Sequence, residues 1–197
     1  LLLKEFEEDT GITVNILKGG SDELIEKISR EGEDTSADLL ITADAGRLHR
    51  AKSKGLLQPV SSDTLFNNIP QNLRDEENYW FGLTKRARVL VYAKDRVDES
   101  NLSSYADLKD DRWENEILVR SSSNIYNQSL LASFIELHGK EGATEWAKEV
   151  VDNMARKPQG NDRAQATAVA AGQGDIAIMN TYYIGKMLNS SNPEEVK

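Results

Sequence analysis

Two phenols stand side by side where a short apolar run gives way to the pattern of a helix. Tyr182 and Tyr183 lie in the stretch DIAIMNTYYIGKML, residues 175–188, and the apolar run before them predicts a buried strand. Both are expected in the first turn of the next helix, where successive side chains diverge by about 100° yet can still reach one cleft. The alternative places one ring in the core and the other at the surface, and for an arbitrary adjacent pair it is favoured.

A phenol binds a metal ion as the phenolate. Its unperturbed pKa is about 10, so at neutral pH a strong cation must displace the proton. A small, hard, highly charged ion does this and prefers anionic oxygen to sulfur or imidazole. Tyrosine also ligates ferric iron in haem proteins, and a helix N-terminus would stabilise the phenolates. Tyr182 and Tyr183 are therefore candidate ligands of such an ion.

A second loop of interest, Arg120–Asn127, reads RSSSNIYN. Small hydroxyl side chains at a helix start are typical of anion sites, because the first backbone N–H groups of a helix are unpaired. Simple helix capping by serine and asparagine explains the same pattern, and the loop by itself favours capping. This loop also carries a third phenol, Tyr126.

Two arginines, Arg86 and Arg88, fall on one face of an expected extended segment, because side chains alternate along a strand. A cation beside a group of phenolates would lower their pKa values and offset surplus negative charge. A surface salt bridge is the alternative role for these side chains.

Composition excludes several kinds of site and partner. The 197 residues contain no cysteine and only two histidines, which excludes disulfides, thiolate metal sites and sites with several imidazole ligands. A net charge of −9 without a Lys/Arg cluster argues against nucleic acid and anionic membranes as partners. No apolar run approaches the ~20 residues of a membrane span. No sequence signature indicates an enzyme.

Apolar periodicity predicts α/β organisation in the first part of the chain. The expected elements are helix 1–9, strand 12–17, helix 21–32, strand 37–43 and helix 45–55. Ser21 and Asp44 are the expected N-caps of the second and third helices, and the nearly continuous apolar run 37–43 is typical of a parallel strand buried on both faces.

The pattern restarts after Asp98. An extended segment with the strand-like pieces FGLTKR and RVLVYAKD precedes it, and the expected elements that follow are helix 103–108, strand 114–122, helices 127–139, 140–156 and 161–174, strand 175–179 and a last helix. We expect a first lobe over 1–84, a crossover over 85–98 and a second lobe over 99–197, with mostly parallel sheets flanked by helices. Ligands of such sheets bind beyond the carboxyl ends of strands, here at loops 42–46, 120–127 and 179–185.

Taken together, four stretches resemble one family along nearly the whole chain. They are ADLLITADAGRLHRAKSKGLLQPV, GLTKRARVLVYAKDRV, RSSSNIYNQSLLASFI and GDIAIMNTYYIGKML. In order and spacing these stretches are similar to the periplasmic ferric-ion-binding proteins of bacterial ABC iron importers. The resemblance implies a bilobed periplasmic-binding-protein fold of type II, with a cleft between the lobes.

The resemblance also implies a site and its partners. Tyr182 and Tyr183 would be two ligands of Fe³⁺, Tyr126 a third as in the cyanobacterial-type subgroup, and Arg86 a charge close to the iron. A synergistic anion such as carbonate would complete the coordination. The protein would be a periplasmic monomer that delivers iron to an inner-membrane ABC permease, and not an enzyme. Lys186 would approach the cleft more weakly.

Departures from the family pattern concern the two ends. The resemblance implies a further ligand, a tyrosine with a histidine close by, in a loop before Leu1, and more chain after Lys197, so that the sequence covers about two thirds of a family domain. We therefore expect a chain truncated at both ends, with an incomplete first lobe and impaired iron affinity. His49 lies in an expected helix and does not match the family's metal histidine.

Two other functions remain open at this point. In the first, a protein of the same fold binds an oxyanion or a small organic ligand through residues 120–124 and Arg86. In the second, an enzyme or a regulatory effector domain uses the same bilobed architecture, since fold does not fix function.

Overall fold

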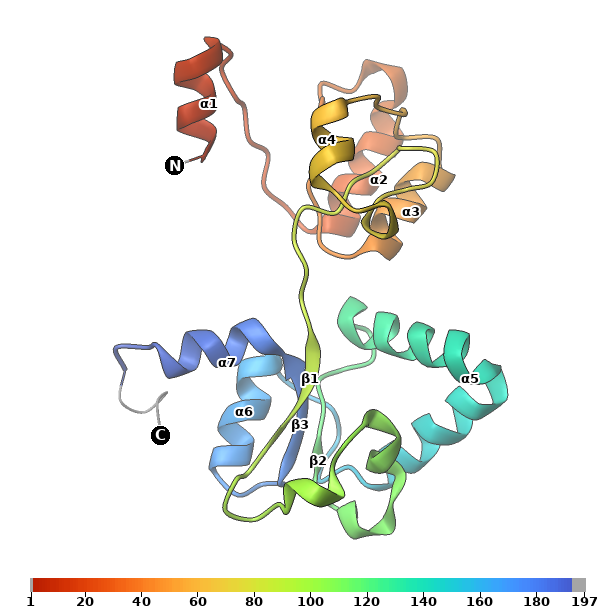
Figure 1. Cartoon of the computed structure of the whole chain (residues 1–197), viewed down its shortest axis with the longest axis vertical. Coiled ribbons are helices and arrows are strands. Elements are labelled where there is room, and N and C mark those ends of the chain that lie inside the picture. Colours follow the sequence, from red (N-terminus) through yellow and green to blue (C-terminus); the bar gives the residue numbers. More distant parts are fainter. Residues whose placement is uncertain (1, 193–197) are drawn as a thin grey trace. The chain divides into compact units, whose positions relative to one another are not determined.

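The protein forms two structural units, which are described here separately. A computed structural model describes residues 2–192, and contacts along the chain divide it into Leu1–Gly82 and Leu83–Lys197. The helices and strands are labelled in Figure 1. Among the described residues, no helix is long and apolar enough to cross a membrane.

The first unit is helical over its described residues. It contains α1 (Leu2–Thr10), α2 (Ser21–Glu31), α3 (Ala45–Ser53) and α4 (Asp63–Asn68), with 3₁₀ turns at Gly32–Asp34 and Gln71–Leu73. The expected cap Asp44 is confirmed, since its side chain accepts a hydrogen bond from the Gly46 N–H. Ser21 is instead the first residue of α2, so its predicted capping role is wrong. The Glu23 carboxylate accepts from the Gly20 N–H there.

The two strands predicted in this unit, 12–17 and 37–43, are absent. Between residues 2 and 82 no named strand occurs, and the sole pairing is an isolated bridge between Arg74 and Phe81. The apolar side chains of both segments are exposed, Leu39 at 83% and Ile41 at 77%. A strand needs a neighbour to pair its backbone N–H and C=O groups, and these segments have none within the described part of the unit.

The second unit is built on a three-stranded sheet. Its strands β1 (Arg88–Tyr92), β2 (Ile117–Leu118) and β3 (Ile176–Asn180) are arranged in the order β1-β3-β2. β1 pairs with β3 antiparallel and β2 pairs with β3 parallel, so the expectation of mostly parallel sheets is corrected to a mixed sheet. Strand 114–122 is reduced to two residues, and the FGLTKR piece contains no strand beyond the bridge at Phe81.

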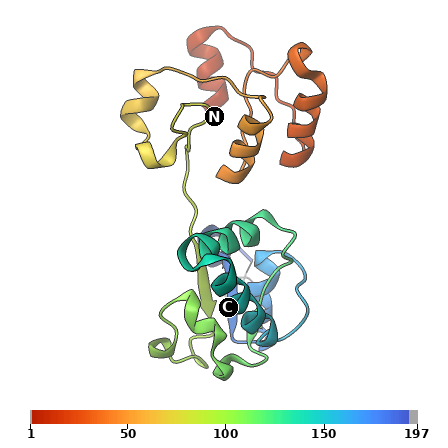
Figure 2. The ribbon, with the colours of Figure 1, turned by 90° about the vertical axis from the view of Figure 1, so that its right-hand side faces the viewer.

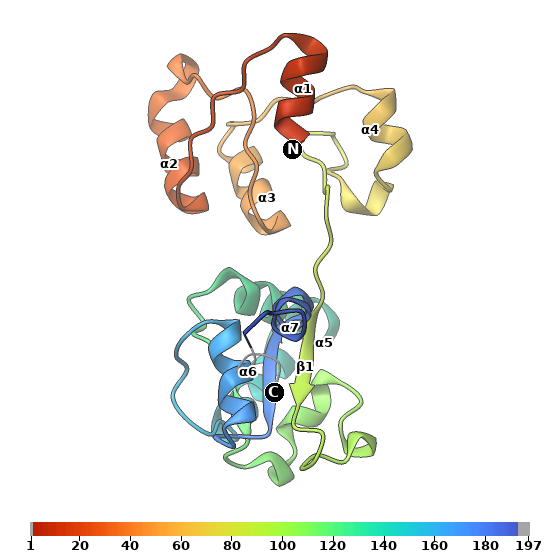
Figure 3. The same ribbon diagram turned by 90° about the vertical axis from the view of Figure 1, so that its left-hand side faces the viewer.

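Helices cover both faces of this sheet, and side chains of β3 alternate between them. Ile176 and Ile178 pack on the face covered by α5 (Ile125–Asp152), which Figure 2 shows. Ala177 and Met179 pack on the face of α6 (Asp162–Ala170) and α7 (Thr181–Leu188), shown in Figure 3. The central strand is therefore buried along its whole length, as a strand between two helical layers must be.

Helix ends follow the local sequence closely in the second unit. Asn124 caps α5 by accepting from the Tyr126 N–H, and Asn161 caps α6 by accepting from the Ala164 N–H. The capping interpretation of the serine-rich loop is thus confirmed for Asn124, whereas Ser121 and Ser123 bond to each other within the loop. Gly139 interrupts α5 with a φ of 73°, the left-handed conformation that glycine adopts without steric cost. Short 3₁₀ helices at Glu99–Asn101, Tyr105–Lys109 and Asp111–Trp113 join β1 to β2.

Candidate functional site

One end of the sheet brings the loops of interest together. Strand register places Arg88 opposite Asn180, and the Thr181 N–H donates to the Ala87 carbonyl at 3.0 Å. The antiparallel pairing therefore sets the arginines at the start of β1 beside the first turn of α7, which begins at Thr181 and carries the adjacent tyrosines. The capped start of α5 supplies Tyr126 to the same end.

The hydroxyl groups of Tyr126 and Tyr182 meet although 56 residues separate them. Their oxygens lie 3.3 Å apart, and Arg86 Nη1 donates a hydrogen bond to the Tyr126 oxygen at 3.0 Å. The predicted association of Arg86 with a phenol is thus present in the structure. Arginine has no hydrogen-bond acceptor, so the Tyr126 oxygen accepts this bond. The O–H proton of Tyr126 remains available for a hydrogen bond to Tyr182.

Tyr183 joins this pair through its ring. The ring centroids of Tyr182 and Tyr183 are 4.3 Å apart, with a tilt of 32° between the ring planes. Tyr183 also packs against the apolar cluster that contains Met179 and Met187. Both adjacent tyrosines are half-buried, so the alternative of one core ring and one surface ring does not describe them. The contacts within the cluster bring two hydroxyls together and attach the third phenol through its ring.

Cationic side chains surround the ring of Tyr126. The guanidinium carbons of Arg86, Arg120 and Arg88 lie 4.9, 5.5 and 5.9 Å from its centroid. Lys186 Nζ lies 5.9 Å from the centroid of the Tyr182 ring. Within residues 2–192 neither Arg86 nor Lys186 forms an ion pair with a carboxylate. The neighbourhood of the phenols therefore carries surplus positive charge, which suits anionic oxygen.

A buried carboxylate, Asp162, organises the other two arginines. It is fully buried at the start of α6 and pairs with Arg88 Nη1 and Arg120 Nη1, each at 3.1 Å. The alternative role of a surface salt bridge does not describe Arg88, because only 9% of its side chain is exposed. Asp162 was not among the predicted site residues, since an acid in the first turn of a helix is ordinary in sequence.

The electrostatic setting keeps Tyr126 protonated while no metal ion is bound. Burial, followed by the hydroxyl of Tyr182, raises the pKa of Tyr126 above its ordinary value, against the opposing effect of Arg86. The phenol is consequently neutral at pH 7. An ion that binds to its oxygen must displace a proton, as a strong Lewis acid does.

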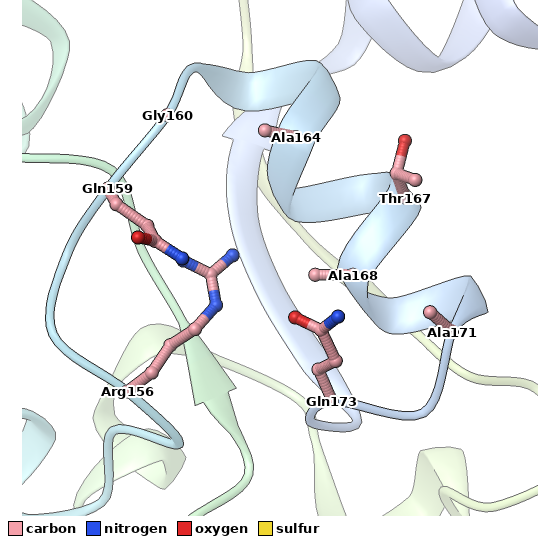
Figure 4. Close-up of a pocket in the computed structure, with 8 residues that line it drawn as sticks. All are labelled: Arg156, Gln159, Gly160, Ala164, Thr167, Ala168, Ala171 and Gln173. Carbon is pink, nitrogen blue, oxygen red and sulfur yellow. The ribbon is translucent and has the colours of Figure 1, made fainter.

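A separate surface pocket of about 580 Å³ lies between α6 and the loop of residues 156–160 (Figure 4). Its lining combines one guanidinium with amides, a hydroxyl and small side chains, contributed by Arg156, Gln159, Gly160, Ala164, Thr167, Ala168, Ala171 and Gln173. None of these lining residues is a tyrosine or a carboxylate. The phenol cluster is therefore a different site, and no group of three or more His, Cys, Asp or Glu side chains placed for a metal ion occurs among the described residues.

Known proteins resemble this chain in sequence and in structure. The family described as bacterial extracellular solute-binding proteins matches residues 34–196. "Iron uptake protein A1" of a Synechocystis strain is 47% identical over 194 residues, which is 98% of this chain and 54% of that protein. The "Fe(3+)-binding periplasmic protein" of Serratia marcescens is 29% identical over 90% of this chain and 52% of its own length.

Among solved structures, the Trichodesmium protein IdiA (FutA) in complex with iron and citrate is similar with a TM-score of 0.94. It is 54% identical, and the match covers 98% of this chain and 61% of that one. The chain thus spans about half the length of the curated relatives it matches.

Proposed function

Because this chain belongs to the family of bacterial extracellular solute-binding proteins, we propose that its phenol cluster binds Fe³⁺ as cargo for an ABC-type importer. The observation that supports this proposal most directly is the 3.3 Å separation of the Tyr126 and Tyr182 oxygens. Bonds from protein oxygen atoms to a small metal ion such as Zn²⁺ measure about 2.0–2.2 Å, and at such distances one ion can contact both oxygens. The names of the similar proteins, which concern iron uptake and ferric binding, support the same cargo.

The remaining residues have distinct proposed roles. Tyr183, whose ring contacts that of Tyr182, supplies a third phenolate after a rotation within the first turn of α7. Arg86 stays outside the coordination sphere and compensates the phenolates through its contact with Tyr126. A bound anion such as carbonate would complete the coordination beside this positive charge. Each phenol would lose its proton to water as the ion binds.

The location of the whole protein and its transport partner are proposed on the same basis. It would act in the periplasm as a monomer and hand the ion to an inner-membrane permease, without catalysing a reaction. Lys186, which lies near the ring of Tyr182, would add to the positive field that compensates the bound phenolates.

Binding of an oxyanion by the serine-rich loop is less well supported. The side chain of Asn124 already accepts from the Tyr126 N–H, and the hydroxyls of Ser121 and Ser123 bond to each other at 2.9 Å. These groups are thus used within the loop and at the start of α5. Arg86 instead donates to the phenol of Tyr126, which favours a metal ion as the ligand.

A ferric citrate titration tests the proposal. Fe³⁺ bound by phenolates should give a visible ligand-to-metal charge-transfer band, and replacing Tyr126, Tyr182 and Tyr183 together by phenylalanine should abolish it. Tyr92→Phe is the matched control, because Tyr92 lies in β1 and its hydroxyl donates to Glu99 at 2.9 Å, outside the cluster. A protein that stays colourless, or a triple variant that keeps the band, would refute phenolate ligation.

A further inference from the structure

We infer that Asp162 is a positioning residue that holds the turn carrying Tyr126 and the turn carrying Tyr182 in register. The inference deepens the proposed ferric function and rests on it. Asp162 touches neither phenol, and it would act through the arginines and the backbone that it fixes.

The carboxylate of Asp162 joins three separate segments. One oxygen accepts from Arg88 Nη1 in β1 at 3.1 Å and from the backbone N–H of Asn180 at 2.8 Å. The other oxygen accepts from Arg120 Nη1 at 3.1 Å. Asn180 is the N-cap position of α7, two residues before Tyr182, and Arg120 begins the loop that leads to Tyr126.

Arg88 extends this connection to the residue beside Tyr126. Its Nη2 donates to the Asn127 side-chain oxygen at 2.6 Å and to the Ile178 carbonyl at 3.2 Å, while its Nη1 also donates to the Asn180 side chain at 3.1 Å. Asn127 in turn donates to the Arg120 carbonyl at 2.8 Å. Asn127, which follows Tyr126, and Asn180, two residues before Tyr182, are therefore both bonded to the Arg88 guanidinium.

The arginines that Asp162 orients also form the walls around Tyr126. Arg120 and Arg88 lie 5.5 and 5.9 Å from its ring centroid, where a guanidinium is attracted to the face of the ring. With Asp162 absent, two guanidinium groups in a largely buried space would lose their carboxylate, and they would move apart or toward solvent. The ring of Tyr126 would then lose the walls that direct its hydroxyl toward Tyr182.

A carboxylate is the one side chain of this size that suits the position. It accepts hydrogen bonds at both oxygens, whereas an amide presents N–H groups on one side. The variant Asp162→Asn keeps the volume of the side chain but sets an amide donor against one of the guanidinium or backbone donors. The change therefore removes the organising charge without creating a cavity.

A second ion pair, near the other end of β3, provides a matched control. Asp175 lies immediately before β3, at the other end of this strand from Asn180. Its carboxylate pairs with Arg96 Nε at 2.6 Å. The variant Asp175→Asn breaks a carboxylate–arginine pair in the same unit without altering the surroundings of the phenols. A general loss of stability should affect iron binding alike in both variants, whereas a positioning role affects it only in Asp162→Asn.

The experiment combines ferric citrate binding with a double-mutant cycle in the 197-residue chain. Loss of a group that orients metal ligands typically costs about 10- to 100-fold in metal affinity, and this range is expected for Asp162→Asn, with a changed charge-transfer band. In a Tyr126→Phe background the same substitution should cost several-fold less, because the register between Tyr126 and Tyr182 no longer contributes to binding. Equal losses in both backgrounds, or an equal loss in Asp175→Asn, would overturn the inference.

Two further measurements keep the outcome clear. If Asp162→Asn fails to fold, Arg120→Met tests the same connection, because in that variant Asp162 keeps its bonds to Arg88 and Asn180. Arg120→Met should weaken iron binding by about tenfold. Unchanged iron binding in this variant would overturn the inference. Ring-to-ring nuclear Overhauser effects between Tyr126 and Tyr182 in the iron-free protein test the positioning without metal. Their loss in Asp162→Asn alone supports the inference even if ferric binding itself is disproved, and their persistence overturns it.

Discussion

Iron binding at Tyr126 should release a proton that can be counted. The pKa of this phenol lies above its ordinary value, because of burial and the neighbouring hydroxyl of Tyr182. Between pH 6 and pH 8 the iron-free side chain therefore carries its proton, and an ion bound to its oxygen must remove it. Tyr126→Phe should thus release one proton fewer per iron than the parent protein.

The magnitude follows from proton linkage. Each proton released makes the binding constant rise tenfold per pH unit, equivalent to about 1.4 kcal/mol of binding free energy. Binding should therefore strengthen as pH rises, and the slope of log K against pH should be smaller by one in Tyr126→Phe. Citrate speciation acts equally on both proteins and cancels in the difference.

The assay is a calorimetric titration with ferric citrate in buffers of different ionisation enthalpy, which counts protons directly. Tyr92→Phe should match the parent protein, since Tyr92 lies outside the cluster and bonds to Glu99. If Tyr126→Phe binds iron and releases as many protons as the parent, Tyr126 is not a ligand and the proposed coordination is wrong.

Three further predictions concern stability. Burial raises the pKa of Tyr105 to about 12, so the folded state holds this proton more tightly than the unfolded state. Stability should therefore fall by about 2 kcal/mol from pH 10 to 12, and urea titrations of Tyr105→Phe should lack this loss. Gly160→Ala should cost about 1–2 kcal/mol, because φ is +65° and the new Cβ would lie 2.7 Å from Ala164 Cβ; an unchanged urea midpoint would contradict the strain. Gly185→Ala, in helix α7 with open space around it, should instead add up to about 1 kcal/mol, and a lowered midpoint would contradict that expectation.

The sequence was sufficient to predict a helix or strand whose caps, stop residues or apolar run lie within or directly beside it. The caps Asn124 and Asn161, the stop at Gly139 and the apolar run of β3 are local features, and the helices and the strand that they predict are present. The predictions of strands 12–17 and 37–43 were wrong because apolar composition shows only that a segment can pair. Pairing itself requires a neighbouring strand from elsewhere in the chain.

The phenols and the arginine of the site could be predicted from the sequence, but the residue that holds them in position could not. Tyr126, Tyr182 and Arg86 were singled out, and their side chains meet. Asp162 was missed because its burial depends on tertiary contacts with Arg88 and Arg120, which are 74 and 42 residues away. Sequence spacing carries no signal for a contact of that range.

X-ray diffraction at the iron absorption edge, from crystals grown with ferric citrate, tests the central claim most directly. An anomalous peak should lie about 2.0–2.2 Å from the oxygens of both Tyr126 and Tyr182, on the side away from Arg86. A peak that lies instead among surface carboxylates, or at the pocket beside α6, would contradict the account.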